Sequence, residues 1–159
     1  MRRPRPRALA VLGALAALAA CTAPAGGPLV IVGATLIDGT GKPPLLDAFL
    51  VIEGDRIKAV GPQAMVPLPK GARVLDARGK FIVPNPDRLT RADAGQALAE
   101  RIQAGVTPLR AIVELTAGKT LEPGQPAELA ILNRDPLLSP DSLTSVFQVV
   151  SGGRLQPAR

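Results

Sequence analysis

The sequence of 159 residues has no histidine, tryptophan or tyrosine, and it has a single cysteine. Without histidine, no serine or cysteine of the chain can be activated by an imidazole base, which excludes the common nucleophile systems of hydrolases. A single cysteine cannot form an internal disulfide bond, so the fold carries no mark of an oxidising compartment. Three phenylalanines are the only aromatic residues, which leaves little for stacking on nucleic-acid bases.

The composition is that of a globular protein with room for one ordinary domain. Hydrophobic residues make up 47% and charged residues 20% of the chain. The 17 prolines and 16 glycines predict short, frequently interrupted secondary-structure elements. The formal charge of +6 falls to +2 when Arg2, Arg3, Arg5 and Arg7 are set aside, and the remaining basic residues are scattered among acids. We therefore predict that nucleic acid is not a partner.

The first 21 residues have the pattern of an export signal. A basic segment is followed by an apolar run from Ala8 to Ala20, which is too short to span a bilayer because about 20 apolar residues are needed. The ending Leu18-Ala19-Ala20-Cys21 resembles a bacterial lipobox. That resemblance implies that residues 1–20 are a signal peptide and that Cys21 becomes the lipid-modified first residue of the mature chain.

Residues 21–28 then form a short tether rich in proline and glycine. The lipobox resemblance makes the membrane a partner through the lipid anchor and places the protein in the cell envelope. Thr22, which is not acidic, favours the outer membrane or its periplasmic face in a host that has one. An ordinary cleaved signal with an incidental Cys21 and an uncleaved anchor are the alternatives.

Short β-strands dominate residues 29–84. Leu29–Asp38 is rich in β-branched residues and ends in turn residues, which predicts a strand. Ala48–Val60 predicts a hairpin with Glu53-Gly54-Asp55 at its tip. Two further strands are predicted at Arg73–Ala77 and Lys80–Val83, so this half is a meander too thin to stand alone.

The pattern changes to helix after residue 84. Thr90–Ala104 is rich in alanine with Leu98 and Ile102 four residues apart, which predicts a helix that ends at Gly105. Thr107 is the predicted cap, and Pro108 the opening residue, of a second helix at Leu109–Thr116. The pair is interpreted as a helical hairpin that covers a sheet.

Strand patterns return at the end of the chain. Leu121–Pro126 predicts a turn, Ala127–Asn133 a strand, and Ser145–Val150 another strand followed by a hairpin tip at Ser151–Leu155. The predicted fold class is therefore mainly β with a helical hairpin (α+β). A small composite β-sandwich is built from residues 29–84 and 121–159, and residues 85–120 form a helical bridge.

Three groups of segments, taken in this order, resemble the amidohydrolase superfamily, in particular its exported imidazolonepropionase-like and prolidase-like members. They are Leu29–Gly39 with Val51–Ile57 and Gly79–Pro84; Ala104–Ile112; and Leu121–Leu132 with Asp135-Pro136-Leu137 and Gly152-Gly153-Arg154. The resemblance implies an accessory β-sandwich built from both chain ends with a (β/α)₈ barrel between them.

The same resemblance implies where metal chemistry would begin. In the family a His-x-His pair follows the proline that corresponds to Pro84, and these and later ligands hold one or two divalent metals, such as zinc, that activate water to attack a C–N bond. Here Pro84 is followed by Asn85-Pro86-Asp87-Arg88-Leu89. We therefore predict a deleted barrel with no catalytic residue, metal ligand or cofactor, and interpret Asp87 as a solvated loop residue.

Three functional hypotheses follow from this interpretation. The leading one is a truncated, lipid-anchored amidohydrolase relative without hydrolytic activity. The second is a binding or scaffolding module of the envelope that self-associates, or binds a protein, through an exposed surface that formerly faced the barrel. The third is a decayed or artificially joined gene product. An enzyme remains an alternative only with a partner chain that supplies every metal ligand.

Overall fold

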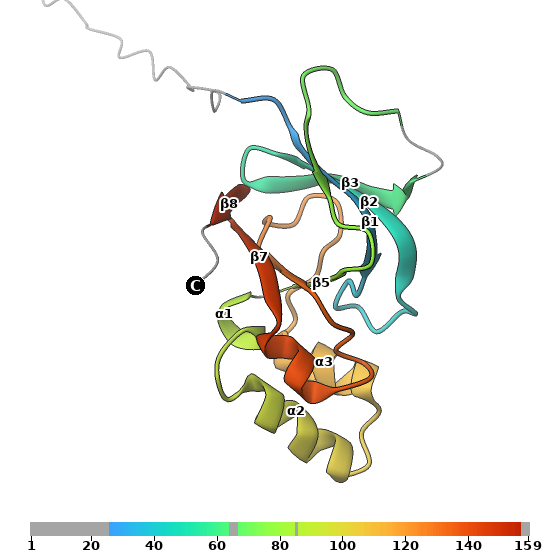
Figure 1. Ribbon diagram of the computed structural model, residues 1–159, viewed down its shortest axis with the longest axis vertical. Helices are drawn as coiled ribbons and strands as arrows, with labels where there is room; N and C mark the ends of the chain where they lie inside the picture. The colour runs from blue at the N-terminus through green and yellow to red at the C-terminus, as the bar shows by residue number, and fades with distance from the viewer. Residues whose placement is uncertain (1–25, 64–66, 85, 157–159) are drawn as a thin grey trace, which may run out of the picture.

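The computed structural model describes residues 26–63, 67–84 and 86–156, shown as coloured ribbon in Figure 1. The predicted signal peptide and Cys21 lie outside the described residues. Within the described ranges, no helix combines the length and the apolar character needed to cross a membrane.

The described residues form eight strands, three α-helices and one 3₁₀-helix. In chain order these are β1 (Leu29–Leu36), β2 (Leu45–Glu53), β3 (Arg56–Pro62), β4 (Arg73–Asp76), β5 (Phe81–Pro84), α1 (Pro86–Leu89), α2 (Ala94–Gln103), α3 (Pro108–Leu115), β6 (Leu129–Leu132), η2 (Pro140–Thr144), β7 (Val146–Ser151) and β8 (Arg154–Gln156). The strands of both chain ends lie together, and the helices gather at the other end of the molecule (Figure 1).

One mixed sheet contains all eight strands, in the order β3-β2-β1-β5-β6-β7-β8, with β4 also paired to β1. Strand β1 is antiparallel to β2, and its other edge pairs in parallel with β4 from Leu29 and with β5 from Thr35. The exchange of neighbours occurs around Gly33, where φ is +81° and an added Cβ would lie 2.3 Å from Cγ of Arg78. A glycine is needed at this position because the segment that contains Arg78 passes very close to the backbone of β1.

Strands from the two chain ends complete each other. Strand β5 is antiparallel to β6 from the pair Phe81–Leu132 to the pair Pro84–Leu129. The segment before β6 also bonds to the start of β3, because Ile57 N donates to Gln125 O at 2.9 Å and Gly124 N donates to Ile57 O at 2.8 Å. The predicted mainly β fold composed of both chain ends is confirmed, and its two halves belong to one continuous sheet folded over on itself.

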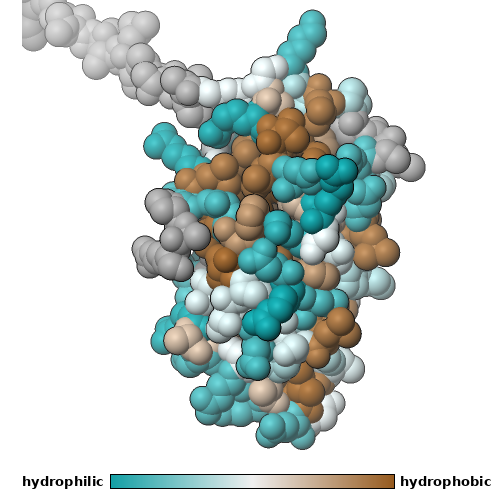
Figure 2. Space-filling view, in the orientation of Figure 1, coloured by the Kyte–Doolittle hydropathy of each residue, from teal (hydrophilic) through white to brown (hydrophobic). Residues whose placement is uncertain are grey.

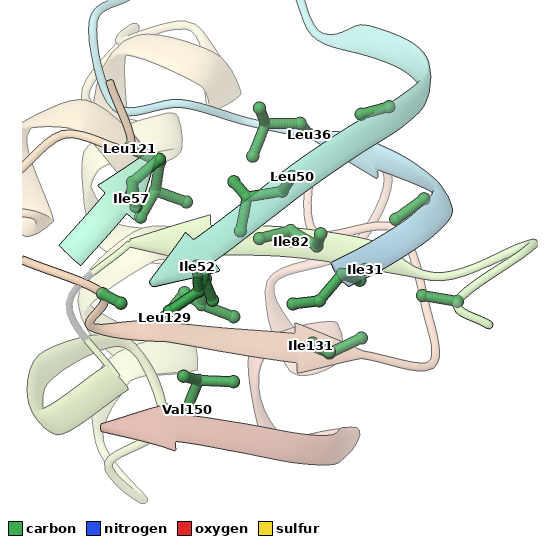
Figure 3. Packing of buried hydrophobic residues seen from close by; sticks show 14 of the residues in the cluster. Ile31, Leu36, Leu50, Ile52, Ile57, Ile82, Leu121, Leu129, Ile131 and Val150 are labelled. Atoms are coloured by element: carbon green, nitrogen blue, oxygen red, sulfur yellow. The ribbon is translucent and has the colours of Figure 1, made fainter. Parts of the chain in front are cut away.

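The main hydrophobic core lies inside the folded sheet. Leucine and isoleucine side chains from β1, β2, β3, β5 and β6 converge there with Leu121 and Val150 (Figure 3). Ile31, Leu50 and Ile82 have no exposed surface. Burying a side chain of this size fully contributes about 1.5–3 kcal/mol each, so this cluster is a principal source of stability.

A second core lies between the sheet and the helices. Strand β6 is buried on both faces: Leu129 and Ile131 join the first core, while Ala130 and Leu132 join the second. The helical side of the second core contributes mainly the following residues: Leu89, Leu98, Ala111, Ile112 and Leu143. Helices α2 and α3 are also linked at the surface by an ion pair between Arg101 Nε and Glu114 Oε2 at 3.3 Å.

The helical region differs from the prediction in three details. The short helix α1 and the 3₁₀-helix η2 occur where no helix was predicted. Thr107 occupies the N-cap position of α3 as predicted, but its side chain makes no capping hydrogen bond. Pro108 does open α3 as predicted, because a helix leaves the first backbone N–H unpaired in any case.

Candidate functional site

The position where metal chemistry would begin lies between β5 and α1. Pro84 is buried at the end of β5 and packs against Gly39, where an added Cβ would lie 2.9 Å from Cγ of Pro84 and 2.6 Å from Lys119 O. Leu89 is fully buried in the second core, whereas Asp87 is exposed. Asp87 belongs to α1 and is not the loop residue that the sequence suggested, although it is solvated as expected.

Asp38, an acid that follows β1, is engaged in a turn. Oδ1 of Asp38 accepts hydrogen bonds from Thr40 N at 2.8 Å and from Thr40 Oγ1 at 2.7 Å, which fixes the turn after β1. Lys42 Nζ of the same turn lies 3.6 Å from Glu122 Oε1. These contacts attach the turn to the segment that leads toward β6.

Other carboxylates of the described region also have basic partners. Arg78 donates side-chain hydrogen bonds to Asp76, and this contact lowers the pKa of Asp76 to about 2. The same pair raises the pKa of Arg78. Glu114 lies within 3.4 Å of both Arg101 and Arg110. A carboxylate held by a cation in this way is a weak candidate for a general base, because its ionised form is already stabilised.

The residues present do not fit the family's metal centre. Across residues 26–63, 67–84 and 86–156, no three residues among the His, Cys, Asp and Glu side chains are grouped so as to hold a metal ion. The chain as a whole has no imidazole, and imidazoles are the ligands that a catalytic zinc site mainly uses. No metal-dependent step can therefore be assigned to the side chains that the structure describes.

Among the described residues, two of the surface hollows are considered as candidate binding sites. A cleft of about 320 Å³ lies between the turn at Thr40 and helix α3, with Leu109 and Val113 among its lining residues. A groove of about 1280 Å³ lies where the start of β1, the β2–β3 turn and the β7–β8 turn come together. We call this second hollow the turn groove.

The predicted lipidation site cannot be placed. Leu18, Ala19, Ala20 and Cys21 lie outside the described residues, so they stay predictions from the sequence. The turn groove, in contrast, was missed by the sequence interpretation. Its walls come from Arg73 and Arg154, which lie far apart in the chain, and the only local signal was the pair of glycines at the β7–β8 turn.

No family model matches the sequence. A curated relative, an N-acyl-D-aspartate deacylase from Alcaligenes xylosoxydans xylosoxydans, is 38% identical over 90 residues, which cover 54% of this chain and 17% of the relative. The chain therefore spans about a sixth of the length of that relative.

Solved structures of similar local sequence include phenylurea hydrolase B and molinate hydrolase. The first is 40% identical over 36% of this chain and 13% of that chain, with a TM-score of 0.35. The second is 30% identical over 56% of this chain and 20% of that chain, also with a TM-score of 0.35. The relatives found are amidohydrolase-superfamily enzymes matched over part of their length.

Proposed function

We propose that this chain, which resembles the amidohydrolase superfamily over part of its length, is an envelope protein that is anchored by a lipid and does not catalyse hydrolysis. Its fold would be the accessory β fold of that superfamily. The observation that carries the proposal is the direct pairing of β5 with β6. Strand β5 ends at Pro84, the position after which the family's metal ligands would begin. It pairs directly with β6, which comes from the C-terminal part of the chain. Helices α1, α2 and α3 and the segment of residues 116–128 lie between the two strands in sequence.

The chemistry supports the absence of hydrolysis. Attack of water on a C–N bond at neutral pH needs a nucleophile of lowered pKa, which a metal bound by several side chains supplies. The donor set required for that centre is missing from this chain, since it has no histidine and its described acids are not grouped. The alternative of an intersubunit enzyme requires a partner chain that brings all of the ligands.

Anchoring through Cys21 would hold the domain close to the bilayer. Gly26, the first described residue, follows Cys21 by five residues, which span at most about 18 Å when fully extended.

Hydrolysis can be tested with the purified full-length protein. We expect no turnover above the buffer blank with N-acyl-D-aspartate, dipeptides or hydantoins, with either Zn²⁺ or Mn²⁺ added. Metal-dependent turnover that co-purifies with the protein, and that disappears with a chelator, would contradict the proposal. The N-acyl-D-aspartate deacylase from Alcaligenes xylosoxydans xylosoxydans, assayed in parallel, is the positive control for the N-acyl-D-aspartate substrate.

Lipid anchoring needs a separate test, because the protein could lack hydrolytic activity without being anchored. We expect cells fed a labelled fatty acid to label the wild-type protein and not Cys21→Ser, and we expect the variant to leave the membrane fraction. Equal labelling of both proteins would refute the anchor. Genomic reads across residues 84–90, with detection of stable protein in the envelope, distinguish this proposal from a decayed or artificially joined gene.

The second candidate function is a binding or scaffolding module. In the described residues, helices cover the face of β5 and β6 that Val83, Ala130 and Leu132 form. Large exposed hydrophobic side chains occur instead at Leu46, Leu68, Val74, Leu138 and Leu155. Of these, Leu155 lines the turn groove.

A further inference from the structure

The turn groove is bordered by two sheet edges. Strand β8 pairs only with β7, and β4 pairs only with β1, among the strands of the described residues. Arg154 and Leu155 of β8 line one side of the groove, and Arg73 at the start of β4 lines another. Unpaired strand edges are sites where another chain can add a strand, so this region has the backbone features of an interface.

The groove has an apolar floor. Leu29 and Ile52 lie at its base and are almost fully buried in the main core. Leu155 is 38% exposed and pairs directly with Val150, so its side chain lies on the same face as this core residue. Figure 2 shows hydrophobic surface mainly in the upper half of this face of the molecule, with smaller areas below. An apolar surface next to an open strand edge favours a protein partner.

The charges around the groove indicate which partner it fits. Two arginines, Arg73 and Arg154, and two acids, Glu53 and Asp55, line it, so the formal charges balance. Within the described ranges no ion pair involves Arg73, Arg154 or Asp55, while Glu53 lies 3.4 Å from Lys58. An anionic lipid or an acidic peptide would leave the acids opposed to like charge. Because charges of both signs line the groove, a second copy can set its Asp55, and the Glu53 of its exposed Lys58 pair, against the two arginines of the first.

We propose that the turn groove is the interface of a symmetric dimer, with a second copy of this chain as its occupant. A twofold axis brings the same patch of both copies together, so arginines of one copy face acids of the other. Leu155 of each copy then covers the apolar floor of its neighbour's groove. The groove has fewer lining residues than the roughly 20–30 per side of a standard interface, so the dimer is weak in solution.

Sedimentation velocity of the detergent-solubilised full-length protein tests this interface. Over about 1–200 µM, a range suited to a small interface, we expect reversible monomer–dimer exchange. Leu155→Arg should weaken the dimer at least about tenfold, as expected when a central apolar contact becomes a repelling charge. The matched control is Leu138→Arg, because Leu138 is 85% exposed and does not line the groove. It should leave the association constant unchanged.

Arg154→Glu and added salt provide a second measurement that does not depend on Leu155. Both should weaken the dimer, because its charge pairs lie near the rim and are screened by ions. Far-UV circular dichroism of each variant verifies that it is folded. A protein that stays monomeric over the whole range, or that captures a different protein while monomeric, would overturn the proposal. So would a dimer that Leu155→Arg and Leu138→Arg weaken equally.

Discussion

The contact between the two hairpin turns makes a sharp prediction about how the chain ends hold together. Gly153 is buried at the β7–β8 turn with φ of +72°, and an added Cβ would lie 1.8 Å from the carbonyl oxygen of Gly54 in the β2–β3 turn. That oxygen belongs to the backbone, so it cannot move aside as a flexible side chain could. Gly153→Ala must therefore push the two turns apart.

The size of the effect follows from two contributions. A left-handed backbone costs a residue with a Cβ about 1–2 kcal/mol relative to glycine. Forcing atoms into filled space costs typically about 1–3 kcal/mol more. The neighbouring Gly152 also has positive φ, +55°, but nothing lies within 4 Å of an added Cβ there. Gly152→Ala bears the first cost alone, so Gly153→Ala should be less stable than Gly152→Ala by about 1–3 kcal/mol.

Urea unfolding followed by far-UV circular dichroism measures this difference. With an m-value of about 1–3 kcal/mol/M for a small protein, Gly153→Ala should unfold at a clearly lower urea concentration than Gly152→Ala. Both variants should keep the wild-type m-value if the unfolded states are alike. Equal midpoints for the two variants would refute the argument, because they would show that the turns are not in contact in solution.

Three further results are expected. Leu98→Ala should cost about 2–5 kcal/mol by emptying part of the second core, whereas Leu138→Ala, at an exposed site, should leave the urea midpoint nearly unchanged. Because the pKa of Asp76 falls from 3.8 unfolded to about 2 folded, its ion pair with Arg78 stabilises the fold above pH 4. That small contribution is lost as pH falls toward 2, so Asp76→Asn should reduce the loss of stability in this interval, measured by unfolding at each pH. Adding Zn²⁺ or a chelator should not shift the thermal midpoint; a rise with zinc would reveal a site.

The hairpin of β2 and β3 is the element that the sequence predicted most completely. Its tip was placed at Glu53-Gly54-Asp55, and the strands do turn there, with Gly54 at φ of +62°. Local chemistry determines such a turn, because a glycine between two β-branched segments favours a reversal whatever the rest of the chain does. The composite sheet was also predictable, since each half contains too few strands to bury its own apolar residues.

The contacts between segments that lie far apart in the sequence could not be predicted from the local sequence pattern. Nothing in the residues around Ile57 indicates that its backbone bonds to Gly124 and Gln125. The turn groove has the same origin, because its charged walls meet only after both chain ends fold together. The 3₁₀-helix η2 did have a signal that was passed over: Pro140 follows Ser139, and a proline at the first position is typical of a helix start.

The burial of β6 changes the role of the helical bridge. The sequence of β6, Leu-Ala-Ile-Leu, has no polar residue, and both faces of this strand are buried. One face is covered by the folded sheet, but the other is covered by α2, α3 and η2, which shield Leu132 and Val83 from water. Without these helices, an apolar face of β5 and β6 would be exposed, and such a face promotes aggregation. The helices of the bridge therefore cover an apolar face of the sheet that would otherwise be open to water.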